Sequence, residues 1–172
     1  MSIKVNGDII NNGVWKPYYT YLEGSSPQTI TLTTGKVFDC NFFSYNTTKV
    51  TANSDLVING FMNIQSGLLD MNGYTPIMNS ISGKMINVVE MRIKDLISSD
   101  ITGLNGKVKI IGTTNYQGGK INGNLTIEDT LKSTSYVTYT VNGTITNNGT
   151  IIGNMSIKVN GDIINNGVWK PY

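Results

Sequence analysis

The segment VNGTITNNG at residues 141–149 returns one short step later in the chain as VNGDIINNG at residues 159–167. Val141, Gly143 and Ile145 share one parity within this segment, and the opposite parity is mainly polar. Alternation with a period of two is typical of a β-strand that has one buried face. A single strand pair cannot bury such a row, whereas stacked coils bury it as a continuous apolar column. The segment therefore predicts a solenoid of short strands.

Steps in which an apolar residue precedes Asn-Gly recur along the chain, and the last four follow one another at nearly even spacing. Because Asn and Gly tolerate the left-handed backbone region of sharp turns, these steps are expected at corners. The spacing predicts coils of about 18–22 residues stacked on their neighbours. The apolar residues of the steps are Val5, Ile58, Met71, Leu104, Ile121, Val141 and Val159.

A larger repeat frames the chain, because residues 1–18 and 155–172 are identical at every position. We expect residues 1–154 to form one full solenoid period of about seven to nine stacked coils, and residues 155–172 to start the next period. Met155 follows Asn154 in mid-chain, so Met1 need not be an initiator. The alternative is a complete protein with two duplicated end coils.

The composition agrees with an all-β chain. Of 172 residues only 14% are charged, and 22 Asn, 20 Thr and 19 Gly favour strands and turns over helices. The net charge of +2 comes with no basic run, so no nucleic-acid partner is expected. No apolar window is long enough for a transmembrane helix, so no membrane insertion is expected. The N-terminus lacks signal-peptide features, although an internal period would carry its targeting signals elsewhere.

Two pairs of residues are expected to shape the corners. Asn147 and Asn165 occupy equivalent positions and, if they point inward, their amides form a hydrogen-bonded ladder along the axis. The alternative is that both are solvent-facing turn residues. Gly143 and Gly161 follow the Asn of their turns and are expected to be structural turn residues.

Residues 14–27, with Pro17 and Pro27, interrupt the pattern and are expected to form a protruding loop that contains an aromatic segment at residues 14–22. Trp and Tyr combine apolar area with a polar tip and are enriched where proteins or sugars dock, so the segment is a candidate contact surface. The alternative is an aromatic cap over the side of the solenoid. The candidate residues are Trp15, Tyr18, Tyr19 and Tyr21, with Trp169 and Tyr172 in the second copy.

Catalysis is not expected. The chain has no histidine, so the commonest general base and metal ligand are missing, and no catalytic, metal or cofactor residue is predicted. Cys40 has no partner for an intrachain disulfide and is expected to be a small buried hydrophobic residue, with an inter-chain bond as the alternative. A β-helix polysaccharide lyase or hydrolase remains a third possibility, with Asp95 and Asp100 or Glu128 and Asp129 as paired carboxylates.

Residues 76–100 lack Asn-Gly, and their β-branched content favours strands over a helix.

Residues 56–75 and 141–151 resemble the repeats of bacterial cell-surface β-solenoid proteins, which include large adhesins and filament proteins. The resemblance implies a right-handed parallel β-helix, an extracellular or cell-surface location and a structural role as a fibre, stalk or adhesin. The implied partner is the protein itself, through end-to-end stacking of periods or subunits. Surface glycans are a further candidate partner for the aromatic segment.

Overall fold

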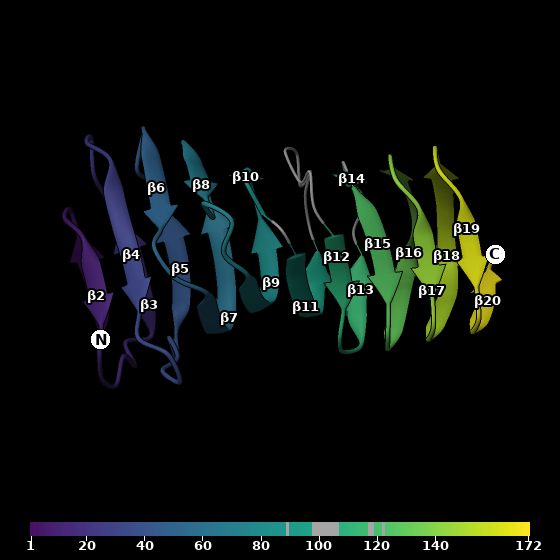
Figure 1. Cartoon of the computed structure of the whole chain (residues 1–172), viewed down its shortest axis with the longest axis horizontal. Helices are drawn as coiled ribbons and strands as arrows, with labels where there is room; N and C mark the ends of the chain where they lie inside the picture. The colour runs from purple at the N-terminus through teal and green to yellow at the C-terminus, as the bar shows by residue number, and fades with distance from the viewer. Residues whose placement is uncertain (89, 98–106, 117–118, 122) are drawn as a thin grey trace.

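The computed structural model describes residues 1–88, 90–97, 107–116, 119–121 and 123–172. All regular structure in these ranges is β-strand, and every strand pair is parallel. The strands lie side by side along one long axis, with the two termini at its opposite ends (Figure 1). This is a parallel β-solenoid, so the predicted fold class is confirmed. The described part of the chain contains no helix that is long and apolar enough to cross a membrane.

The described coils are triangular, and within each coil the chain passes through three faces in turn. Residues 98–106, between β11 and β12, lie outside the described ranges. The first face contains β1 (Ser2–Val5), β3 (Tyr19–Leu22), β5 (Asn41–Ser44), the second parts of β7 (Leu56–Ile64), β9 (Pro76–Ser82) and β11 (Glu90–Ile97), then β13 (Thr114–Tyr116), the first parts of β16 (Thr130–Val141) and β18 (Thr150–Val159), and β20 (Val168–Pro171).

The other two faces are built in the same way. The second face contains one sheet of β2 (Ile9–Asn11), β4 (Gln28–Leu32), β6 (Lys49–Ala52), β8 (Leu68–Asp70) and β10 (Met85–Ile86). Further along the same face lie β14 (Gly119–Ile121) and the second parts of β16 and β18, because each follows a first-face strand in the chain and precedes a third-face strand. In the described residues these strands are not paired with β10. The third face contains bridges at Trp15 and Phe38, the first parts of β7, β9 and β11, then β12 (Lys107–Ile110), β15 (Asn124–Ile127), β17 (Ile145–Asn147) and β19 (Ile163–Asn165).

The core lies inside the triangle and follows from the alternation of the strands. In β4, for example, Gln28, Ile30 and Leu32 are buried while Thr29 and Thr31 are half-buried. On the third face one inward column runs in register through Ile58, Met78, Ile93, Ile110 and Ile127, all buried. Each such side chain contributes about 1.5–3 kcal/mol when fully buried, so the stacked column stabilises the fold along its whole length.

The coil count matches the prediction from spacing. Ten strand segments follow one another on the first face from β1 to β20, which makes nine turns. A 154-residue period therefore holds about eight coils, within the predicted seven to nine.

Two local expectations are now decided by the described residues. Within residues 76–100 the structure forms β9 (Pro76–Ser82), β10 (Met85–Ile86) and β11 (Glu90–Ile97), so the preference for strand there is confirmed, while residues 89 and 98–100 lie outside the described ranges. The expected loop at residues 14–27 is wrong at Tyr19–Leu22, because these residues form strand β3. The reason is that its alternation of half-buried and buried residues continues the first face, which Pro17 does not interrupt.

The corners use Asn-Gly in more than one way. At Asn72 and Gly73 both residues have positive φ, 49° and 85°, as expected for a sharp turn. Gly143 and Gly161 do not have a positive φ, so their turn function has a different cause. A Cβ on Gly161 would lie 2.7 Å from the backbone carbon of Gly143, and one on Gly143 would collide with Gly123 and Asn124. These glycines permit close approach between successive coils.

Candidate functional site

Six aromatic side chains gather on the outer surface of the first face near the N-terminal end. They come from β3, β5 and β7 and from the residues next to β3 and β5, and the strand residues among them alternate with inward, buried neighbours such as Thr20, Phe42 or Met62. We call the set the aromatic patch. Its members are Tyr18, Tyr19, Tyr21, Phe43, Tyr45 and Phe61.

Phe43 lies at the centre of the patch. Its ring is stacked against Tyr21 at 5.5 Å and 18° and against Tyr45 at 6.3 Å and 13°. Tyr19 and Phe61 meet the same ring edge-on, at 5.5 and 5.1 Å. The register explains this packing, because Tyr21 and Phe43 are direct neighbours across parallel strands. The result is a row of rings that stay half-buried or exposed although they touch one another.

Charged groups border the patch on the side of the first coil. Lys4 lies beside Tyr21 in the strand register and forms an ion pair with Glu23 at 2.9 Å. Its side chain is largely exposed, so this pair adds little stability. The patch therefore combines an apolar centre with a charged rim.

The structure separates the predicted contact residues into two groups. Tyr18, Tyr19 and Tyr21 belong to the patch, whereas Trp15 turns toward the core. The indole Nε1 of Trp15 donates to Thr20 Oγ1 at 2.9 Å, and its ring meets Phe38 edge-on at 5.9 Å.

In the second copy, at the far end of the solenoid, the Trp is again packed against the core and the Tyr is again exposed. Trp169 is partly buried and packs against the core, and Tyr172 is exposed. Neither residue is near the patch, since β20 pairs with β18 and not with β3.

Sequence reasoning missed Phe43, Tyr45 and Phe61. A signal was present, because Tyr19-Thr-Tyr and Phe43-Ser-Tyr45 alternate in the same way, with Tyr21 and Phe43 one coil length apart. The spacing between coils is easiest to see from Ile145 to Ile163, and the coil from Tyr21 to Phe43 is longer than that. A search at the shorter spacing therefore does not bring Tyr21 and Phe43 to equivalent positions.

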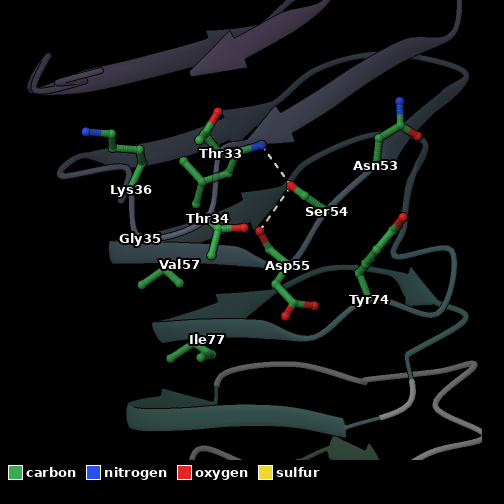
Figure 2. Close-up of a pocket in the computed structure, with 11 residues that line it drawn as sticks. Thr33, Thr34, Gly35, Lys36, Asn53, Ser54, Asp55, Val57, Tyr74 and Ile77 are labelled. Atoms are coloured by element: carbon green, nitrogen blue, oxygen red, sulfur yellow. Dashed lines mark hydrogen bonds between the residues drawn. The ribbon is translucent and has the colours of Figure 1, made fainter. Parts of the chain in front are cut away.

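A cavity of about 350 Å³ opens beside the second and third faces, under the turn at residues 33–36 (Figure 2). Hydroxyl groups, Lys36, Asp55 and Tyr74 line it. Several of its polar groups are already engaged: Ser54 Oγ accepts from the Leu32 amide at 2.7 Å and donates to the Asp55 carbonyl, and the Asp55 carboxylate accepts from the Thr75 amide at 2.8 Å. Ser54 and Asp55 thus hold the turns together.

The asparagines at 147 and 165 belong to the inward parity of the third face. Asn147 is fully buried, and its Nδ2 donates to Asn165 Oδ1 at 2.8 Å and to the Val168 carbonyl at 2.9 Å. A second amide contact runs outside, from Asn166 Nδ2 to Asn148 Oδ1 at 3.0 Å. Side-chain amides at equivalent corners therefore hydrogen-bond along the solenoid axis both on the inside, between Asn147 and Asn165, and on the outside, between Asn166 and Asn148.

Cys40 is buried, as predicted, and its Sγ lies 3.4 Å from Thr20 Oγ1. Burial raises the pKa of the Cys40 thiol, and the Thr20 contact offsets this only in part. The protonated form is the less nucleophilic one, so the thiol has the character of a core residue. In the described residues no group of three His, Cys, Asp or Glu side chains could hold a metal ion.

The two identical segments form the first and the last coil, and their equivalent residues differ in exposure. Met155 is 5% exposed while Met1 is 89% exposed, and Ile9 is 2% exposed while Ile163 is 54% exposed. In the strand register Ile9 lies beside Ile30 of the following coil and Met155 beside Val137 of the preceding coil, whereas Ile163 has a neighbour, Ile145, only in the preceding coil. Comparison of the chain with family models, with curated proteins and with solved structures finds no match.

Proposed function

We propose that the chain is a structural period of a self-continuing β-solenoid, which spans distance as part of an extracellular or cell-surface fibre, stalk or adhesin. Its partner is the next period or a second copy of the chain, placed end to end. The observation that carries the proposal is the identical coil at both ends, with different residues exposed in its two copies.

The open end at residues 155–172 supports this role. Ile163 belongs to the inward parity, in register with the buried Ile145, and no coil covers its other side here. Its counterpart Ile9 is covered by Ile30 of the second coil. A following period would place the counterpart of Ile30 beside Ile163. Solenoids need a cap or a further repeat at such an end, because otherwise apolar core and strand edges are left open.

A pair of lysine substitutions tests this continuation. In a chain that continues for one further period, Ile163→Lys buries a charge between two coils and is expected to lower the free energy of unfolding by at least about 3 kcal/mol. In the 172-residue chain the same change is expected to cost less than about 1 kcal/mol, because the ammonium reaches water at the open end.

Ile164→Lys is the matched control, because Ile164 is the adjacent residue of the same strand and points outward. It should be tolerated in both chains. Equal tolerance of Ile163→Lys in both chains, measured by urea unfolding, would contradict the proposal.

The aromatic patch favours a second candidate function, a carbohydrate- or surface-binding module. The stacked rings of Tyr21, Phe43 and Tyr45 offer a row of apolar area, and Tyr21 and Tyr45 add hydroxyl tips, which suits contact with sugar rings. In an array the patch would recur once per period, so that weak single contacts would add up to high avidity.

Serine substitutions test the patch on an array of immobilised polysaccharides. The double change Tyr21→Ser and Tyr45→Ser is expected to weaken binding at least about tenfold, which corresponds to the loss of about 1.4 kcal/mol. Tyr136→Ser is the control, because Tyr136 is 69% exposed and outside the patch. Retained binding by the double variant, or no binding by the unmodified chain to any polysaccharide, would remove this candidate.

A further inference from the structure

The two identical segments do not lie on the same face of the triangle. In the first copy, residues 2–5 pair with β3 on the first face. In the second copy, the equivalent residues 156–159 pair with residues 138–141 of β16, which in turn pair with β14 on the second face. Equivalent strands of the two copies are therefore one face apart.

The rest of the repeated segment shows the same displacement. Residues 9–11 form β2 on the second face, and their equivalents 163–165 form β19 on the third. Trp15 bridges to Phe38 on the third face, whereas Trp169 pairs with Ile151 on the first. All three strand positions have moved by one face in the same direction.

The corner through which a strand runs on also changes place along the chain. In β7, β9 and β11 the strand runs on through the corner between the third and first faces, with a register shift between Ile58 and Phe61 in β7. In β16 and β18 the strand runs on through the corner between the first and second faces. The second copy begins directly after this type of corner, which has itself moved one face around the triangle.

From these pairings we infer that a 154-residue period advances the solenoid by eight coils and one face, so that successive periods are related by a third of a turn. Along an array the aromatic patch would then face three directions in succession and return to the first face after three periods. The consequence for arrays rests on the proposed function, but the displacement itself lies within one chain.

The inference depends on an unbroken third face, because a gained or lost strand in the middle of the period would change the final face. One outward column on that face runs in register through seven residues. They are Val57, Ile77, Arg92, Lys109, Thr126, Thr146 and Ile164. Neighbours in parallel strands are about 4.8 Å apart, within the range of Cα separations that a disulfide can bridge.

Paired cysteines test the column in the 172-residue chain, with Cys40→Ser as the background. The two middle pairs, Arg92→Cys with Lys109→Cys and Lys109→Cys with Thr126→Cys, are expected to form disulfides under mild oxidation. Two flanking pairs serve as references, Val57→Cys with Ile77→Cys and Thr126→Cys with Thr146→Cys. Mass spectrometry of linked peptides after proteolysis identifies each bond.

Four linked pairs would support the one-face displacement. Linkage of the flanking pairs without one of the middle pairs would overturn it, since the third face would then be broken between β11 and β15. Failure of the flanking pairs would overturn it too, because the strand register would be wrong. None of these outcomes depends on arrays, so the result is separate from that of the lysine test at the open end.

Discussion

Asn147 follows the apolar inward column of the third face and lies between Ile127 on one side and a second amide, Asn165, on the other. Both hydrogens of its Nδ2 are used, one by Asn165 Oδ1 and one by the Val168 carbonyl. A buried amide is tolerated only when its donors find acceptors, and here the acceptors come from the next coil. Asn147 therefore links two coils by bonds that an aliphatic residue could not make.

Asn147→Asp tests this link without changing the size of the side chain. The carboxylate would face the Asn165 oxygen and the Val168 carbonyl, both acceptors, and we expect the free energy of unfolding to fall by about 3 kcal/mol or more at neutral pH. Burial raises the pKa of such a carboxyl, so the loss should shrink as the pH falls and the group is protonated.

Urea unfolding at neutral and acidic pH measures the effect of this substitution. Asn154→Asp is the control, because Asn154 is exposed between the two parts of β18. A loss for Asn147→Asp no larger than that of the control would show that the amide does not hold the coils together.

For single residues, the sequence predicted the position correctly where the spacing between coils is regular. The repeated turn motif brought Asn147 and Asn165 together as equivalent positions, and the structure joins them by a hydrogen bond. Phe43 could not be placed in the same way, because an aromatic residue next to the buried Phe42 reads equally well as core. Only the strand register shows that Phe43 points outward, against Tyr21.

Among the strands, β7 shows how a corner is made without a loop. It contains Asn59 and Gly60 at the bend between the third and first faces. Gly60 is buried, and a Cβ there would collide with the Cys40 carbonyl oxygen and lie 2.6 Å from Asn41 Oδ1. The same Asn41 oxygen accepts from the Phe61 amide at 3.2 Å. The bend thus brings two coils into contact at a position without a side chain.

Gly60→Ala is expected to destabilise the chain by about 2–3 kcal/mol, because the added methyl must displace backbone of the preceding coil. Gly13→Ala is the matched control, since a Cβ on Gly13 meets nothing within 4 Å and its φ is not positive. We expect the control to change the free energy of unfolding by less than about 0.5 kcal/mol. Equal stability of the two variants in denaturant unfolding would show that a methyl group fits at the bend without displacing the backbone.

Turn chemistry alone could not have distinguished these corners. Asn-Gly was expected to mark left-handed turns, which holds at Asn72 and Gly73 but not at Gly143 or Gly161, where the constraint is the neighbouring coil. The prolines near the aromatic segment suggested a loop, yet Tyr19–Leu22 pairs with strands on both sides. Pairing between coils is a long-range property, and local sequence reports it poorly.

For the whole molecule, the fold was predictable because the same alternation repeats in every coil. The repeat that frames the chain predicted continuation, but it carries no information on which face the second copy occupies. That depends on the number of strands between the copies, and the steps along the third face are uneven. The step from Met78 to Ile93 is shorter than the step from Ile127 to Asn147. Because the coil length varies in this way, the number of coils between the two copies cannot be calculated from one spacing.

The central claim is that one period continues into the next as an unbroken solenoid, and length tests it most directly. Chains of one, two and three periods should grow by about 40 Å per added period in small-angle scattering and electron microscopy, since eight and one-third coils rise about 4.8 Å each. The rods should stay straight through the seams at residues 155–172. Growth well short of this value, or a flexible joint at each seam, would contradict the account.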